Sequence, residues 1–364
     1  MNATRELRDL GQSLWLDNIT RGLLSSGTLA RYVADFNVTG LTSNPTIFDL
    51  AIKDGDFYDD AIRDKSRAGK SGEALFLELA MEDLVRAADL FKPVHEATAG
   101  IDGWVSLEVS PLLLNDTAGT VESAAELHAR AQRPNLFIKI PGTPAGVAAI
   151  EESIFAGVPI NVTLLFSREQ YVAAAEAYLR GIERRIAAGL DPRVASVASL
   201  FVSRWDVAVK DTVPAELRNR LGIAIAQRTY RAYRELLASA RWKSLASAGA
   251  RPQRMLWAST GTKDPAARDV LYVEALAAPG TIDTIPEKTL AAFASHGKVG
   301  GVMRPDGGDA EETIAQFKGA GIDVDALAGQ LQRDGGDAFA KSWNDLMTRI
   351  AAKGAVLAKA RAAT

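Results

Sequence analysis

Short apolar segments alternate with longer stretches of helical periodicity along almost the whole chain. The apolar segments are rich in β-branched residues and nearly continuously hydrophobic, as are the strands of a parallel sheet that helices cover. The stretches between them carry apolar residues at helical spacing, most clearly from Glu73 to Val94. The eight predicted strands are Ser13–Asp17, Val38–Thr42, Gly103–Val109, Leu136–Ile140, Val158–Leu164, Val194–Phe201, Arg254–Ser259 and Thr281–Ile285.

Eight strand–helix units in succession predict an α/β fold, a single (β/α)8 TIM barrel with additional helices, because eight parallel strands close into a barrel that side chains fill. The clearest break in the pattern comes at Gly300-Gly301 and Pro305–Gly308. We therefore expect the barrel over residues 1–299 and a C-terminal helical extension over residues 300–364. The extension is alanine-rich and helical from Ala310 to about Lys359, so we expect it to pack on the barrel as part of the same domain.

The composition is that of an ordinary globular chain, with 47% hydrophobic and 24% charged residues among 364, enough for a large core. A net charge of −3 provides no basic field for nucleic acid or an anionic membrane. No cysteine is present, which excludes disulfides and thiolate chemistry and fits a reducing cytoplasm. No apolar run approaches the roughly 18 residues of a membrane helix, and the first ten residues lack the order of a signal peptide. We expect a soluble, cytoplasmic protein.

The three histidines give no sign of a metal site. His95, His128 and His296 are far apart in the chain, and none has another metal ligand at helical spacing. We interpret each as a packing or surface residue, and we expect neither a metal nor another cofactor.

One lysine interrupts the fourth apolar strand. Lys139 lies between Ile138 and Ile140, and Pro141-Gly142 ends the segment. Such a lysine either reaches out from the edge or end of a strand or is held inside for chemistry. Burial disfavours the ammonium form, so an interior lysine has a lowered pKa and a free amine lone pair. A free amine is what the attack on a carbonyl to form a Schiff base requires.

Polar side chains recur near the C-terminal ends of seven successive predicted strands. In a barrel of this kind these ends meet on one face, where the active sites lie. Buried polar groups cost free energy unless they are hydrogen-bonded, so a convergent set is better explained by a site than by packing. The residues are Asp17, Thr42, Asn44, Glu108, Lys139, Asn161, Thr163, Ser199 and Ser259.

A lysine, two carboxylates and neutral donors, without metal ligands, match imine chemistry. Lys139 would attack a ketone, and Asp17 would move protons during cleavage of a carbon–carbon bond. Glu108 with Thr163 would hold the water used in dehydration and hydrolysis of the imine. An ion pair between Glu108 and a neighbouring lysine is the alternative.

The neutral amides suit a polyhydroxylated substrate. Asn44 and Asn161 would hold substrate hydroxyls. For Asn44, which precedes Pro45, a simple turn residue is the alternative.

Two late loops suggest an anionic substrate. Ser203–Asp206 opens the helix after the sixth strand, and Ser259–Lys263 follows the seventh. Barrels often bind phosphate at such loops through backbone amides, hydroxyls and a cation. Arg204 and Lys263 are the candidate cations, although each could equally be a surface residue.

These segments resemble the transaldolase family in order and spacing, over about residues 10 to 350. The matching motifs are Thr42–Thr46, Phe137–Pro141, Asn161–Ser167, Ser199–Asp206 and Trp257–Lys263. The resemblance implies a Schiff-base enzyme of the pentose phosphate pathway on a TIM barrel. Such enzymes transfer a dihydroxyacetone unit from sedoheptulose 7-phosphate to glyceraldehyde 3-phosphate, giving erythrose 4-phosphate and fructose 6-phosphate.

The resemblance also implies a role for each matching residue. These are Lys139 as the imine-forming lysine, Asp17 as the acid/base, Glu108 and Thr163 at the catalytic water, Thr42, Asn44, Asn161 and Ser199 in the dihydroxyacetone site, and Arg204 and Ser259 at the phosphate.

The chain departs from the family pattern in one binding position and in length. Many members have an arginine at the position of Gly261, and Lys263 is the candidate replacement for its charge. The region 53–72 and the C-terminal extension resemble a longer bacterial subgroup. Related fructose 6-phosphate aldolases tend to carry tyrosine at Phe201, so the phenylalanine in this substrate-site position favours transfer. An aldolase that releases free dihydroxyacetone and a catalytically silent sugar-phosphate-binding barrel are the alternatives, and we expect a monomer or homodimer.

Overall fold

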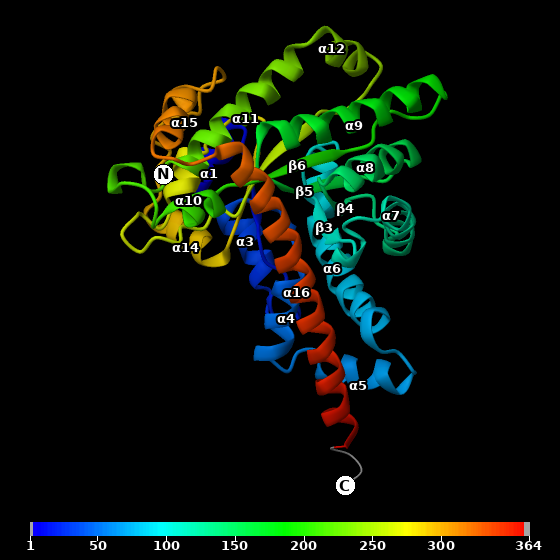
Figure 1. Ribbon diagram of the computed structural model, residues 1–364. Coiled ribbons are helices and arrows are strands. Elements are labelled where there is room, and N and C mark those ends of the chain that lie inside the picture. Colours follow the sequence, from blue (N-terminus) through cyan, green and yellow to red (C-terminus); the bar gives the residue numbers. More distant parts are fainter. Residues whose placement is uncertain (1–2, 360–364) are drawn as a thin grey trace.

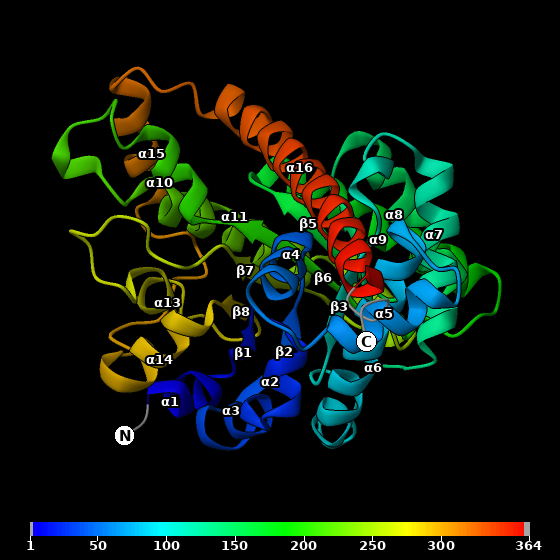
Figure 2. The same cartoon turned by 90° about the horizontal axis from the view of Figure 1, so that it is seen from below.

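The computed structural model describes residues 3–359 and shows a closed barrel of parallel strands in the order β1 to β8, surrounded by helices (Figures 1 and 2). The predicted TIM barrel is confirmed, and every predicted strand agrees with an observed one to within two residues at each end. The strands are β1 (Ser13–Leu16), β2 (Val38–Thr42), β3 (Val105–Glu108), β4 (Leu136–Pro141), β5 (Ile160–Leu165), β6 (Ser196–Phe201), β7 (Gln253–Ala258) and β8 (Ile282–Ile285).

The helices follow the predicted alternation, but two long helical regions are divided. Residues 45–98 form three helices because the chain turns at Gly55 and at Gly69, whose φ of 81° is left-handed. Residues 204–245 are interrupted near Pro214, which has no backbone N–H to continue a helix. Among residues 3–359, no helix is both long and apolar enough to cross a membrane.

The helices are α1 (Ala3–Leu10), α2 (Arg21–Ser25), α3 (Thr28–Phe36), α4 (Pro45–Asp54), α5 (Asp59–Arg67), α6 (Gly72–Ala97), α7 (Thr117–Ala131), α8 (Pro144–Ala156), α9 (Arg168–Ala187), α10 (Ser203–Val209), α11 (Leu221–Ala238), α12 (Ala240–Ser247), α13 (Leu271–Ala275), α14 (Glu287–His296), α15 (Ala310–Gly319) and α16 (Val324–Lys359).

Side-chain caps start three helices just after the strands that precede them. Asn44 accepts a hydrogen bond from the Ile47 amide at 3.1 Å, and Thr143 and Ser167 make the same contact at the starts of α8 and α9. Each cap satisfies an amide at the helix N-terminus and stabilises the helix by about 1 kcal/mol. The caps therefore fix the chain where it leaves the C-terminal end of the barrel.

A tight aromatic cluster fills the barrel wall at β1 to β4. The rings of Trp104 and Phe137 stack with centroids 4.0 Å apart, and Trp15 lies beside them. A Cβ atom on Gly40 would come within 2.6 Å of the Trp104 carbonyl and 2.7 Å of the Trp15 ring. Glycine is required at this position in β2 because the indole occupies that space.

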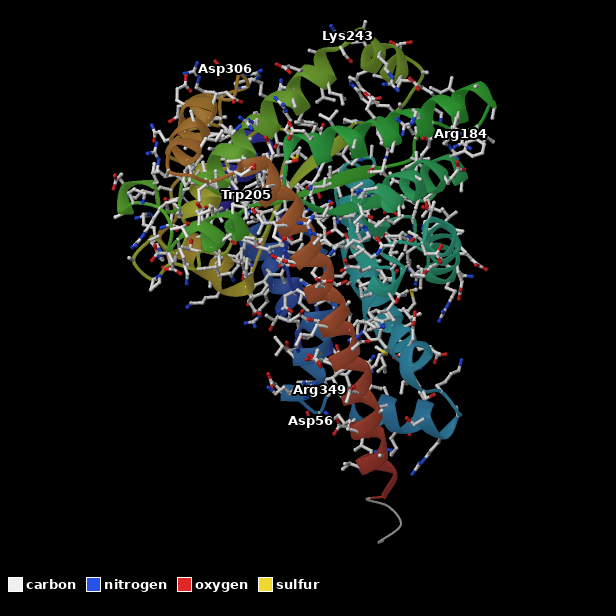
Figure 3. The ribbon with its side chains drawn as sticks, viewed as in Figure 1. Asp56, Arg184, Trp205, Lys243, Asp306 and Arg349 are labelled. Atoms are coloured by element: carbon white, nitrogen blue, oxygen red, sulfur yellow. The ribbon has the colours of Figure 1, made fainter. Side chains whose placement is uncertain are left out.

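The long helix α16 crosses the mouth of the barrel and then runs away from it beside α4, α5 and α6 (Figures 1 and 2). We call this projection, formed by α4, α5 and the adjoining parts of α6 and α16, the arm. Two ion pairs within the arm join α16 to α4 and α5: Arg349–Asp49 at 2.5 Å and Lys353–Asp59 at 2.6 Å. Arg349 is labelled in Figure 3. The predicted extension over residues 300–364 thus contacts both barrel and arm, and its residues 360–364 lie outside the described part.

A buried carboxyl on β8 predicts a specific pH dependence of stability. Asp283 is fully buried, accepts a hydrogen bond from the Thr260 hydroxyl at 2.8 Å, and has a pKa that burial raises to about 7. Below that pH the folded state keeps a proton that the unfolded state has released, so the unfolding free energy falls as the pH rises. We expect Asp283→Asn to remove roughly 2 to 3 kcal/mol of this fall between about pH 5 and about pH 8.

The measurement is urea unfolding of both proteins across that pH range. Asp211→Asn, which changes an exposed carboxylate, is the matched control and should keep the pH dependence of the parent. An equally steep fall in the Asp283→Asn protein would show that Asp283 does not titrate near neutral pH.

Candidate active site

A cavity of about 130 Å³ lies at the C-terminal ends of the strands, where the sequence placed the polar residues. Ten of the twelve predicted site residues line it, and they come from β1, β2, β4, β5, β6 and the loops after β6 and β7. Those ten are Asp17, Thr42, Asn44, Lys139, Thr163, Ser199, Phe201, Arg204, Ser259 and Lys263. The other two, Glu108 and Asn161, lie beneath the cavity in contact with its lining residues.

The lysine points into the barrel, so the alternative of a lysine reaching out from a strand edge does not apply. Lys139 is 5% exposed, and its Nζ donates to the Ser43 carbonyl at 2.9 Å and lies 3.4 Å from Oε2 of Glu108. Strand register pairs Lys139 with Glu108 on β3 and with Asn161 on β5. Residues paired across parallel strands share a face, so these three side chains form a row inside the barrel.

The sequence left open that Glu108 forms an ion pair with a neighbouring lysine. It does form one, and the lysine is Lys139. Burial raises the pKa of Glu108, while the positive charge of Lys139 acts in the opposite direction. Its second oxygen, Oε1, and the hydroxyl of Thr163 are buried and make no hydrogen bond to another described residue. Buried polar atoms of this kind normally have a partner, so both can bind an oxygen of water or substrate.

Asp17 stands at the end of β1 in a chain of hydroxyls. Its Oδ1 accepts a hydrogen bond from Thr42 at 2.9 Å, and the Thr42 hydroxyl lies 2.7 Å from that of Thr284. Desolvation raises the pKa of Asp17, and the charge of Lys139, the hydrogen bond from Thr42 and the charge of Lys263 each lower it. A carboxyl with a raised pKa in a cavity is suited to proton transfer near neutral pH.

The two asparagines are placed differently. Asn161 donates to the Ser106 hydroxyl at 3.1 Å and accepts from Ser199 at 2.7 Å, so protein groups use both ends of its amide. It therefore orients Ser199, which lines the cavity. Asn44 caps α4 through Oδ1, as the turn alternative proposed, and also lines the cavity.

Two cations, Arg204 and Lys263, line the same cavity as Asp17. Arg204 begins α10, and burial lowers its pKa while the charge of Asp334 raises it. It makes no ion pair within residues 3–359, and its guanidinium lies 5.2 Å from the centre of the Phe201 ring. Trp205, buried and labelled in Figure 3, fixes α10 by donating to the Phe166 carbonyl at 3.0 Å.

The loop after β7 supplies the remaining candidate phosphate ligands. Ser259 adopts a left-handed φ of 57° and lies 2.9 Å from the Ser203 hydroxyl. A Cβ atom on Gly261 would lie 3.1 Å from Pro286, so any side chain at this position requires the proline ring to shift slightly. Lys263 lines the cavity beside Gly261, which agrees with its predicted place.

Sequence reasoning missed several residues of the site. Phe339 and Thr284 line the cavity, and Ser43 and Ser106 hold Lys139 and Asn161. Thr284 belonged to a predicted strand and could have been counted with the other polar strand ends. Phe339 reaches the site from the C-terminal extension, and no local pattern marks it.

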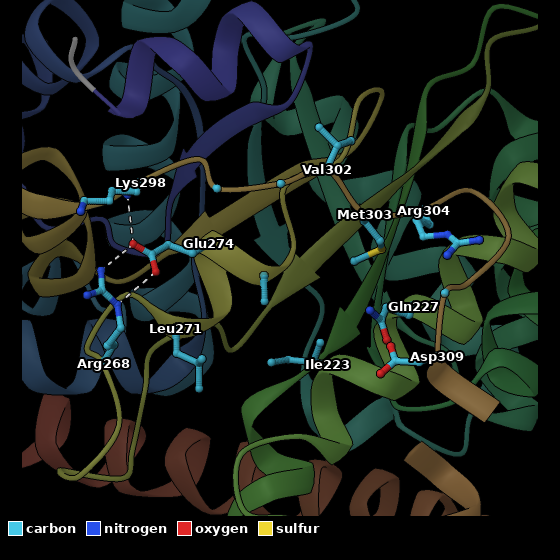
Figure 4. A pocket seen from close by; sticks show the side chains of 14 residues that line it. Ile223, Gln227, Arg268, Leu271, Glu274, Lys298, Val302, Met303, Arg304 and Asp309 are labelled. Atoms are coloured by element: carbon cyan, nitrogen blue, oxygen red, sulfur yellow. Dashed lines mark hydrogen bonds and ion pairs between the residues drawn. The ribbon is translucent and has the colours of Figure 1, made fainter. Parts of the chain in front are cut away.

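A larger cleft, of about 770 Å³, lies between α11, α13 and the loop before α15 (Figure 4). One end carries Glu274, which accepts from the Arg268 guanidinium at 2.7 Å and from the Lys298 amide at 3.0 Å. None of the predicted site residues lines this cleft. Within residues 3–359, no three metal-ligating side chains gather anywhere.

The barrel and the cavity at the carboxyl ends of its strands define a TIM-barrel enzyme. The chain belongs to the transaldolase/fructose-6-phosphate aldolase family, whose profile matches residues 14–350. It is 45% identical to a transaldolase of Thermobifida fusca over 95% of this chain and 97% of that protein. It is 44% identical to a transaldolase of Saccharopolyspora erythraea (94% and 95%) and 43% identical to one of Thiobacillus denitrificans (96% and 100%).

These relatives confirm the predicted family and the predicted transaldolase activity, which transfers a ketone-bearing unit between sugars. Sugar phosphates are the substrates that this family implies.

The hydrogen bond from Thr42 to Asp17 predicts a shift in the pH profile. Thr42→Val removes the donor at nearly constant volume, so the pKa of Asp17 rises. In the role predicted for Asp17, its carboxylate form accepts a proton, so the acidic limb of the kcat/KM profile should move upward by roughly one pH unit.

Thr42→Ser keeps the hydroxyl and is the matched control, with an expected limb at the parent position. Profiles measured with fructose 6-phosphate as donor distinguish the two variants. If the acidic limbs of the kcat/KM profiles lie at the same pH in the valine and serine variants, Asp17 is not the group that titrates there.

Proposed function

We propose that this chain carries out the transaldolase reaction through a Schiff base on Lys139. The observation that carries the proposal is the buried Lys139 amine, 3.4 Å from Glu108 and in one cavity with Asp17. An amine inside a barrel has few substrates other than a carbonyl compound that enters from the strand ends. The proposed donor is sedoheptulose 7-phosphate, and the proposed acceptor is glyceraldehyde 3-phosphate.

In the first step, the neutral amine of Lys139 adds to the ketone carbon, and water leaves to form the imine. Glu108 is the proposed proton acceptor for the amine because it contacts Nζ and its pKa is raised by burial. The free oxygen of Glu108 and the hydroxyl of Thr163 are placed to hold the departing water. This assignment gives a use to both unpaired polar atoms.

In the second step, Asp17 takes the proton from the hydroxyl next to the bond that breaks. The aldose product leaves, and the electron pair of the broken bond remains on the three-carbon unit as an enamine. The protonated nitrogen acts as the electron sink. Addition of the enamine carbon to the acceptor aldehyde, with return of the proton from Asp17, forms the imine of the new ketose. The water held by Glu108 and Thr163 then adds to the imine carbon, the carbon–nitrogen bond breaks, and the ketose and the free amine of Lys139 are released.

The phosphate end of the substrate is proposed to meet Arg204, Ser259 and Lys263. Support comes from the guanidinium of Arg204, which makes no ion pair within residues 3–359, because a half-buried cation without an ion pair favours an anionic ligand. Thr42, Asn44 and Ser199 line the space between phosphate and imine, where they would bind hydroxyls. Phe201 packs against the guanidinium and limits its orientation.

Two coarser expectations belong to the same proposal. The enzyme is proposed to work in the cytoplasm, where a chain without cysteine loses nothing to reducing conditions. It is proposed to act as a monomer or homodimer.

Trapping the imine tests the proposal directly. We expect incubation with fructose 6-phosphate and EDTA, followed by borohydride, to leave a reduced dihydroxyacetone adduct on Lys139, located by mass spectrometry. Lys139→Ala should fold, form no adduct and lose transfer activity, because it removes only the nucleophile.

Lys263→Ala is the control, since it removes another lysine of the same cavity and should still be trapped at Lys139. Binding without an adduct would favour the silent barrel, and normal turnover by Lys139→Ala would reject the mechanism.

The phosphate role of Arg204 is tested separately. Arg204→Ala should raise KM for fructose 6-phosphate about 10- to 100-fold, because a charge-assisted hydrogen bond is lost. The KM for unphosphorylated dihydroxyacetone as donor should change little. Arg168→Ala, at an exposed arginine paired with Glu169, is the control, and equal effects of Arg204→Ala on both donors would contradict the assignment.

A further inference from the structure

The C-terminal extension contributes an aromatic wall to the active-site cavity. Phe339 on α16 lines the cavity and is 6% exposed. Its ring centre lies 5.9 Å from Nζ of Lys139. The ring therefore covers the atom on which the proposed imine forms, on the side of the cavity formed by α16.

The helix that carries Phe339 is seated directly on the barrel loops. Gln332 donates through Nε2 to the carbonyls of Gly142 and Leu164, both at 3.0 Å. One helical turn before Phe339, a Cβ atom on Gly335 would lie only 2.9 Å from the Leu164 side chain. The close approach of α16 to β4 and β5 thus depends on a small residue and on one side-chain amide.

We propose that Phe339 shields the three-carbon unit on Lys139 from additional water and so determines whether this unit is transferred or released. This inference rests on the Schiff-base function proposed above. It assigns to the extension a specificity-determining contact within the reaction.

The three-carbon unit has two possible fates after the first product leaves. In transfer, the enamine carbon forms a bond to the acceptor aldehyde, and water hydrolyses the imine only afterwards, when it carries the complete ketose. In release, the enamine carbon takes a proton, water adds to the resulting imine carbon, and the carbon–nitrogen bond breaks. Release returns the free amine of Lys139 and free dihydroxyacetone, so it consumes one water and no other reactant.

The polar groups near Lys139 favour hydrolysis, so transfer requires that water be kept from the three-carbon unit until the acceptor arrives. Glu108 Oε1 and the Thr163 hydroxyl are buried without a protein partner among the described residues, so they can hold a water near Lys139. A phenyl ring offers such a water no hydrogen bond. Removing the ring opens a space larger than the roughly 30 Å³ that one water occupies, and excluded water is a known way to protect reactive intermediates.

The test compares two rates with fructose 6-phosphate as donor. One is transfer to erythrose 4-phosphate, and the other is release of free dihydroxyacetone without an acceptor. For Phe339→Ala we expect the ratio of release to transfer to rise on the order of tenfold. Phe339→Leu keeps an apolar side chain and should stay near the parent ratio, which separates shielding from an interaction of the ring with the cationic nitrogen.

Leu331→Ala is the structural control, since Leu331 is also on α16, is also 6% exposed, and does not line the cavity. Gln332→Ala loosens the seat of α16 without removing a buried apolar side chain, and it should raise the ratio in the same direction. If Phe339→Ala does not fold, the ratio of release to transfer in Gln332→Ala tests the proposal.

An unchanged ratio in both Phe339→Ala and Gln332→Ala would overturn the inference, as would equal rises in the alanine and leucine variants of Phe339. A rise in Leu331→Ala matching that of Phe339→Ala would also overturn it. Borohydride trapping on the parent protein keeps this outcome apart from the proposed function, since a parent without an adduct at Lys139 would reject the Schiff base itself.

Discussion

The arrangement of the site depends on the burial of one amine, that of Lys139, inside the barrel. A lysine inside a barrel loses its hydration, and an unpaired ammonium there would cost several kcal/mol. The Ser43 carbonyl and the Glu108 carboxylate meet Nζ of Lys139 and offset that loss. The same burial raises the pKa of Glu108 and of Asp17. Burial thus acts in the same direction on both carboxyls of the site.

Charge is distributed across the cavity in a way that orients a substrate. The carboxyls come from β1 and β3, whereas Arg204 and Lys263 come from the loops after β6 and β7. In the binding mode proposed above, the phosphate of a ketose phosphate faces these cations and its ketone faces Lys139. The opposite orientation would bring the phosphate to two carboxyls, which like charges oppose. The order of the strands around the barrel thus accounts for the proposed orientation of the substrate.

The sequence predicted the barrel because each buried parallel strand is a short apolar run, and it predicted the cavity because polar residues interrupt those runs near one end. The helix divisions at Gly55 and Gly69 were missed because residues 45–98 were read as one helical region from its clearest part, Glu73 to Val94. Asn161 was predicted to hold a substrate hydroxyl, whereas its amide bonds to Ser106 and Ser199 beneath the cavity. These partners depend on strand register that no local pattern reveals. Phe339 reaches Lys139 across 200 positions of chain, and only tertiary packing brings the two together.

The change in composition near residue 300 does not coincide with the edge of the active site. Helix α16 is bound at one end through Gln332 to loops of the barrel and at the other through Arg349 to the arm. Between these points it supplies a wall of the cavity. A helix held at both ends has few ways to move away from the imine without breaking one set of contacts. The extension, which the family profile matches as far as residue 350, thus forms part of the cavity wall and is not merely an appended segment.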